Sequence, residues 1–295
     1  MPVLLRRVLA EPRAVIGGLI MLLVLAVALL APLLAPHNPY DLASLNLLDA
    51  RNPPAWQEGG SWDFPLGTDG QGRDVLSAIL YGMRLSLFVG AGAVLLALVV
   101  GVGLGLLAGY AGGWVDVIVM RIADVQLSFP AILVALFVDG VARSLLPRDQ
   151  QDNIALPVVI LAIASSIWVQ FARTVRGSTL VERHKEYVQA ARIIGVRPMR
   201  IALGHVLPNA MGPVLVIATI NLALAIITEA TLSFLGIGIP LTQPSLGTLI
   251  RLGREFLLSG EWWILLFPAA ALASLALAVN LLGDWLRDAL NPKLR

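Results

Sequence analysis

Cysteine is absent from this chain of 295 residues, and charged residues make up only 14% of it. Without cysteine, the chain can form no disulfide and no thiolate metal site. Its only lysines are Lys185 and Lys293, and neither follows a glycine-rich loop, so the chain has no Walker A sequence for ATP hydrolysis. Its 3 histidines are far apart in sequence and match no metal-ligand spacing.

Signatures of membrane hydrolases are missing as well. The sequence contains no Gly-x-Ser-x-Gly elbow and no His-Glu-x-x-His helix. We therefore expect a chain that is not an enzyme and carries no cofactor or metal of its own. A net charge of +2 is too small to indicate a nucleic-acid partner.

Apolar residues are what the chain has in abundance: 58% of the sequence, with a mean hydropathy of +0.82. Soluble domains carry about a quarter charged residues, so this composition predicts an integral membrane protein surrounded by lipid. A helix needs about 20 apolar residues to cross a bilayer. The apolar runs predict an all-α protein with six transmembrane helices, at residues 14–35, 85–109, 115–141, 154–175, 210–236 and 262–282.

The first apolar run follows a short basic N-terminus, residues 1–13. It could be read as a cleaved signal peptide, but it is too long for the apolar core of one, and further spans follow it. We interpret it as a retained span, so that residues 14–295 form one transmembrane domain.

Glycine and proline mark local features of the spans. Gly101, Gly103 and Gly105 predict close helix contact in the second span. Proline removes an internal hydrogen bond, so Pro130 predicts a kink in the third span. Short interfacial helices are expected over residues 74–84 and around residues 249–258.

Residues 67–74, Gly-Thr-Asp-Gly-Gln-Gly-Arg-Asp, resemble a phosphate or calcium loop in their glycine and aspartate content. The segment lacks the Lys-Ser/Thr of a P-loop and the ligand spacing of an EF-hand. We interpret it as turns that cap the helix after it.

The distribution of basic residues predicts the orientation. If the N-terminus is inside, fourteen of the 21 Lys and Arg residues lie on the cytoplasmic side and seven outside, although the outer loops are longer. This asymmetry satisfies the positive-inside rule and places both termini in the cytoplasm.

A basic, mostly polar segment interrupts the apolar sequence at residues 178–208, which we call the hook. Thr179 and Glu182 have the spacing of a capping box at a helix start. Gly195 and then Pro198 predict a helix end followed by a new helix. An apolar stripe is expected at helical spacing, formed by Val181, Val188, Ala191 and Ile194. The residues alone leave two interpretations equally open, a docking element and a solvated loop that sets topology.

The hook resembles the EAA loop of bacterial ABC importer permeases, which reads Glu-Ala-Ala, three residues, Gly, nine residues, Ile, one residue, Leu-Pro. Here the spacing is complete, with Gln189 in place of the Glu and His205 in place of the Ile. Blocks at residues 66–84, 229–238 and 280–295 extend the resemblance to the C-type permease of the dipeptide, oligopeptide and nickel importer group.

The resemblance implies a type I importer fold in which the hook is the coupling loop. The chain would form half of a pore for peptides or similar solutes, beside a B-type permease. Two ATP-binding-cassette subunits would hold ATP and Mg, and an external solute-binding protein would deliver the substrate, in a bacterial inner membrane. The residues implied to dock on an ATPase subunit are Gln189, Ala190, Ala191, Arg192, Gly195, Arg197, Arg200, Leu207 and Pro208.

An ion-coupled secondary transporter is the alternative, and it would need ionisable residues within the membrane. Glu229 is the best candidate, and with Ser233 and Phe234 it forms a candidate pore or gate. In the other interpretation, Glu229 lies near the outer end of its span and pairs with a polar group of a neighbouring helix. We favour pairing because one acidic residue without an ionisable companion is a poor relay.

Overall fold

The structure is a computed structural model that describes residues 12–41, 45–145, 147–240, 242–243 and 245–290. Apart from an isolated bridge between Thr68 and Asp74, regular structure in these residues is helical. Most of the predicted N-terminus, residues 1–13, lies outside the described part. The main helices are α2 (Pro12–Leu29), α3 (Ala31–Leu34), α4 (Val75–Ala111), α5 (Gly113–Leu127), α6 (Ala131–Ser144), α7 (Arg148–Glu182), α8 (Glu186–Ile193), α9 (Pro198–Ile201), α10 (Leu207–Phe234), α11 (Leu246–Arg254) and α12 (Trp263–Leu290).

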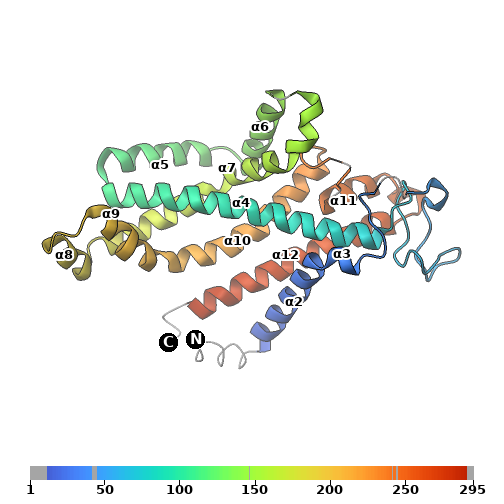
Figure 1. Ribbon diagram of the computed structural model, residues 1–295, viewed down its shortest axis with the longest axis horizontal. Helices are drawn as coiled ribbons and strands as arrows, with labels where there is room; N and C mark the ends of the chain where they lie inside the picture. Colours follow the sequence, from blue (N-terminus) through green and yellow to red (C-terminus); the bar gives the residue numbers. More distant parts are fainter. Residues whose placement is uncertain (1–11, 42–44, 146, 241, 244, 291–295) are drawn as a thin grey trace.

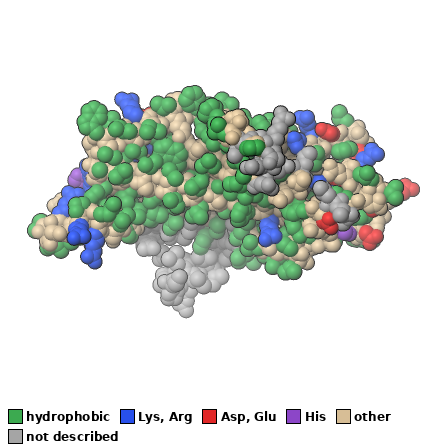
Figure 2. Space-filling view, turned by 45° about the horizontal axis from the view of Figure 1, so that its top comes forward, with side chains coloured by type: hydrophobic (Ala, Val, Ile, Leu, Met, Phe, Trp, Pro, Cys, Tyr) green, Lys and Arg blue, Asp and Glu red, His purple; other side chains and the backbone are tan. Residues whose placement is uncertain are grey.

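The long helices run along the long axis of the molecule, as Figure 1 shows. Helices α8 and α9 lie at one end, and α11 with the loops before α4 lies at the other. Hydrophobic side chains cover much of the visible middle, whereas most charged side chains gather towards the ends (Figure 2). This is the surface expected of a protein whose middle faces lipid.

Four helical segments of the described chain are long and apolar enough to cross a membrane: residues 75–111, 154–182, 198–234 and 263–283. Counting the bent pair α5 and α6 as one span raises the number to five. The first predicted span, residues 14–35, corresponds to α2 and α3, which are outside this count. The structure therefore supports an all-helical membrane protein with at least four spans.

The third predicted span is broken rather than kinked. Helix α5 ends at Leu127, α6 begins at Ala131, and the two are bent by 96°. Pro130 stands directly before the first residue of α6, where its ring and missing N–H end one helix and permit the next.

Helix α4 differs from prediction at its start, because residues 74–84 are not a separate interfacial helix. They begin one unbroken helix of 37 residues, which is about 55 Å long at 1.5 Å per residue. The Asp74 carboxylate caps this helix by accepting from the amides of Leu76 and Ser77, at 3.3 and 2.9 Å. The predicted capping role of residues 67–74 is confirmed.

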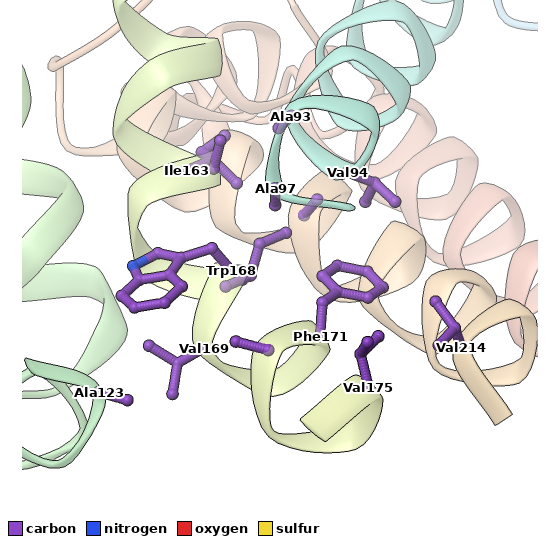
Figure 3. Close-up of a cluster of buried hydrophobic side chains, with 14 of the residues drawn as sticks. Ala93, Val94, Ala97, Ala123, Ile163, Trp168, Val169, Phe171, Val175 and Val214 are labelled. Atoms are coloured by element: carbon purple, nitrogen blue, oxygen red, sulfur yellow. The ribbon is translucent and has the colours of Figure 1, made fainter. Parts of the chain in front are cut away.

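The main core lies where α4 packs on α7. A Cβ on Gly101 would lie 2.5 Å from the Trp168 carbonyl oxygen, and one on Gly105 2.3 Å from that of Ala172, so both positions require glycine. Gly103 is the exception, because a Cβ there would meet nothing within 4 Å. Figure 3 shows Trp168 on the side of α7 towards α5 and Phe171 on the side towards α10. Helix α7 is thus the central element of this core.

Candidate functional site: the hook between α7 and α10

The hook does not begin with the predicted helix start. Helix α7 continues to Glu182, so Thr179 lies inside it, fully buried, and forms no capping box. Thr179 packs against Gly109 of α4, where a Cβ added to Gly109 would lie 2.8 Å from the threonine Cβ. Because Thr179 packs against α4, helix α7 continues past Thr179, although the local sequence resembles the start of a helix.

Glu182 instead organises the turn that follows α7. Its Oε1 accepts a hydrogen bond from Lys185 Nζ at 2.7 Å, and its Oε2 accepts one from the Tyr187 hydroxyl at 2.6 Å. Asn209 Nδ2 donates to the same hydroxyl at 3.2 Å and to the His205 carbonyl at 2.7 Å. Tyr187 therefore joins the end of α7, the first turn of α8 and the start of α10.

Burial and the bond to the Glu182 carboxylate raise the pKa of Tyr187 above its usual value. The phenol is neutral at physiological pH and remains a donor to Glu182. The junction is consequently held by a charge-assisted hydrogen bond, the stronger kind.

Gly195 ends α8 as predicted, with a left-handed φ of +78°. Its amide donates to the Arg192 carbonyl at 3.1 Å, and the Val196 amide donates to the Ala191 carbonyl at 3.0 Å. These two bonds are a Schellman motif, which requires the left-handed residue. Pro198 follows at the first turn of α9, also as predicted.

The apolar stripe is narrower than predicted. Val188 and Ala191 are buried and belong to the main core, whereas Val181 and Ile194 are exposed. Ile201 and Val206, from the far side of the hook, are buried in the same core. The buried side of the hook is thus anchored in the main core, although the rest of the hook projects from it.

The outward face combines apolar and basic side chains. Ile193 and Ile194 are 85% and 78% exposed, and Met199 is 70% exposed. An open hollow of about 820 Å³ lies on this face, and its lining includes Gly195, Arg197 and Arg200. Contiguous exposed apolar surface outside the lipid-facing band indicates an interaction site.

The other hook residues have these positions. Gln189 Nε2 donates to the His184 carbonyl at 3.0 Å, and the Arg192 guanidinium lies 5.8 Å from the centre of the Tyr110 ring at the end of α4. Ala190 is exposed on α8. Leu207 and Pro208 begin α10. The hook thus unites the predicted docking residues on or beside one projecting element.

Glu229 is fully buried on α10, away from the hook. Its Oε2 accepts from Ser86 Oγ of α4 at 2.7 Å, and its Oε1 accepts from Ser233 Oγ at 2.8 Å. Phe234 is the last residue of α10, and the Arg254 guanidinium lies 5.6 Å from its ring centre. The predicted pairing of Glu229 with a neighbouring helix is confirmed.

Sequence reasoning missed the residues that hold the hook in place. Tyr187 and Asn209 are separated by 22 positions, and no periodicity connects them. Arg183 donates to the Gly109 carbonyl at 2.9 Å, a contact that its charge alone does not predict. The sequence feature that could have indicated these residues is the presence of polar side chains at the edges of apolar spans.

Comparison with known proteins identifies the family. Residues 101–295 match the model of the binding-protein-dependent transport system inner membrane component, and residues 3–54 match the N-terminal TM domain of oligopeptide transport permease C. The chain belongs to this permease family. Its relatives are subunits of ABC transporters, so this permease is a multi-pass membrane protein of that class.

Curated relatives match the permease along nearly its whole length. The dipeptide transport system permease protein DppC of Haemophilus influenzae is 38% identical over 96% of this chain and 91% of its own. The glutathione transport system permease protein GsiD of Pectobacterium atrosepticum is 39% identical over 98% and 91%, respectively. The oligopeptide transport system permease protein OppC of Bacillus subtilis is 38% identical over 96% and 86%.

A solved structure supports the fold. The inward-facing MetNI methionine ABC transporter contains a chain that matches with a TM-score of 0.57 at 21% identity, over 72% of the permease and 96% of that chain. These matches favour an ABC importer permease over an ion-coupled secondary transporter.

Proposed function

We propose that this permease is the C-type half of the pore of an ATP-driven peptide importer, and that its hook docks on an ATP-binding subunit. The observation that carries the proposal is the construction of the hook. It projects from the bundle, is built into α7 and α10 by buried side chains, and exposes apolar and basic groups outward. A partner subunit docked on the hook would cover that face.

Rigidity is the property that coupling requires. The Tyr187 bonds to Glu182 and Asn209 connect the hook to a helix on each side. A force on α8 would therefore move α7 and α10 together instead of bending the loop. ATP-driven closure of the ATPase subunits would then tilt the spans between inward-open and outward-open states.

The charge and shape of the outward face would suit an acidic cleft on an ATPase subunit. Arg197 and Arg200 flank the hollow beside Gly195, where acidic groups of a partner could pair with them. Gln189 lacks the charge of the family's Glu, so we assign it a hydrogen bond rather than an ion pair at the interface. The chain itself would be non-catalytic, with ATP and Mg on two partner subunits.

The remaining parts of the assembly follow from the relatives. Their names are those of dipeptide, oligopeptide and glutathione permeases, which makes peptides the substrate class we assign. A B-type permease would supply the other half of the pore. A solute-binding protein would dock on the outer loops, at the end opposite the hook, and both termini would be cytoplasmic, with six spans in all.

Co-purification tests the proposal. The chain is extracted in detergent from its native membrane, and the proteins that accompany it are identified by mass spectrometry. We expect a second permease, P-loop ATPases and a solute-binding protein. A chain that purifies alone, with uptake driven by an ion gradient, would overturn the proposal.

A further inference from the structure

A second hollow, of about 470 Å³, lies at the end of the bundle opposite the hook, where the end of α2 approaches α4. Its lining residues fall into a polar and an apolar group, which we call the rim and the floor. The rim is polar and consists of Tyr40, Tyr81, Arg84 and Gln243. The floor is apolar and is lined by Ala28, Leu29, Leu85, Leu87, Phe88 and Ala91.

The depth of Arg84 in the membrane follows from the sequence of α4. Arg84 directly precedes residues 85–109, which contain no charged side chain. The hydrocarbon core of a bilayer is about 30 Å thick, whereas α4 is about 55 Å long, so the first turns of α4 project beyond it. We therefore assign Arg84, the last charged side chain before this run, to the region where the headgroups meet the hydrocarbon.

Aromatic rings mark the same level. Tyr40 and Tyr81 meet edge to face with ring centroids 4.9 Å apart, and tyrosine is enriched at membrane interfaces. Burial raises the pKa of Tyr40 to about 12, so its phenol is neutral and can donate. The rim therefore offers a cation and phenol donors within one small area.

Arg84 has an exposed side chain and makes no hydrogen bond or ion pair with the described residues. Phe88 and Ala91 lie about 6 and 10 Å deeper along α4, at 1.5 Å per residue. Phe88 and Leu29 are about 60% exposed, so the floor opens sideways towards the acyl chains. A ligand that fits has an anionic head at the rim and a hydrocarbon tail below it.

We propose that this hollow binds a phospholipid, with its phosphate on Arg84 and an acyl chain against Phe88 and Leu29. An anionic lipid such as phosphatidylglycerol would bind more tightly than zwitterionic phosphatidylcholine, because its net charge complements that of the Arg84 guanidinium. The bound lipid would fill the space between α2 and α4 and hold the first span against the bundle.

The test uses the purified transport complex after delipidation. Phosphatidylglycerol is titrated into it, and retained lipids are counted by native mass spectrometry. We expect Arg84→Gln to lose one retained lipid and to bind phosphatidylglycerol about ten-fold more weakly, since a hydrogen bond to a charged group is removed. Arg84→Lys keeps the charge, so its affinity for phosphatidylglycerol should lie between those of Arg84→Gln and the wild type.

Arg51→Gln is the matched control. It removes the same charge at the same end of the molecule, but Arg51 faces Glu261 at 3.7 Å and does not line the hollow. Equal lipid counts in the wild type, Arg84→Gln and Arg51→Gln would overturn the proposal. It would also fail if phosphatidylcholine bound as tightly as phosphatidylglycerol, or if a peptide carboxylate or inorganic phosphate, but no lipid, bound at Arg84.

Discussion

Asp116 at the start of α5 accepts two hydrogen bonds from the guanidinium of Arg176 near the end of α7. Nη2 donates to Oδ2 at 2.6 Å and Nε donates to Oδ1. Arg173 makes a second ion pair with Asp124 at 2.5 Å. Only Val119 and Ala123 of α5 are buried, so polar contacts supply much of the attachment between α5 and α7.

Charge reversal tests this attachment. We expect Asp116→Arg or Arg176→Asp to lower the unfolding free energy by about 1–2 kcal/mol, between the values for surface and buried ion pairs. Each should reduce peptide-stimulated ATP hydrolysis, because α5 would no longer follow α7. The double exchange Asp116→Arg/Arg176→Asp should restore most of the unfolding free energy and most of the ATP hydrolysis. Thermal unfolding and an ATPase assay of the complex measure the two quantities. No recovery in the double variant would contradict a pairwise attachment.

Gly195 provides the most direct test of coupling. A β-branched residue there must adopt a left-handed conformation at a cost of about 1–2 kcal/mol, although no neighbouring atom obstructs it. We expect Gly195→Val to abolish substrate-stimulated ATP hydrolysis while membrane insertion remains intact. Gly195→Asn is the control, since asparagine tolerates this conformation, and it should retain most of the activity. Undiminished uptake by Gly195→Val would exclude the coupling role.

Glu229 should be replaceable by glutamine but not by leucine. In Glu229→Gln the amide can still accept a hydrogen bond from one serine and donate one to the other. We therefore expect the unfolding free energy to fall by less than about 1 kcal/mol. Glu229→Leu leaves the buried Ser86 hydroxyl without its partner and should lower stability by about 2 kcal/mol. Thermal unfolding of the purified complex measures both, and equal losses would argue against the hydrogen-bonded arrangement.

The absence of cysteine makes the orientation easy to measure, since any introduced thiol is the only one in this chain. Ile193→Cys on the hook should react with a membrane-impermeant maleimide in inside-out vesicles stripped of peripheral proteins. Trp62→Cys, which replaces an exposed residue at the opposite end, should react in intact spheroplasts. The reverse pattern would invert the proposed topology.

Several features of the fold could be read from residue type and spacing. Gly195 and Pro198 identified a helix end and a helix start because only a few residues suit those backbone positions. Gly101 identified close helix contact for the same reason. In each case the information lies in one residue and its neighbours in the chain.

Features that depend on contacts between distant segments were not predictable in this way. Thr179 and Glu182 have the local spacing of an N-cap, but packing on Gly109, 70 positions away, continues the helix through them. Asp116 and Arg176 are 60 positions apart and could be paired only once α5 and α7 were known to be adjacent. The outward face of the hook was likewise undefined until its buried side was known.

The break between α5 and α6 has a consequence for how the subunit matures. The chain turns at Ser128, Phe129 and Pro130, which are exposed. The amides of Ser128 and Phe129 keep partners in the carbonyls of Val125 and Gln126, both at 3.1 Å, and the Pro130 carbonyl accepts from the Leu133 amide at 2.9 Å. Backbone polar groups facing lipid without partners cost several kcal/mol each, so irregular backbone at membrane depth must be covered by protein or reached by water. In a bilayer, a second subunit that covered the exposed bend would therefore stabilise the permease, so the bend would link the folding of this chain to its assembly.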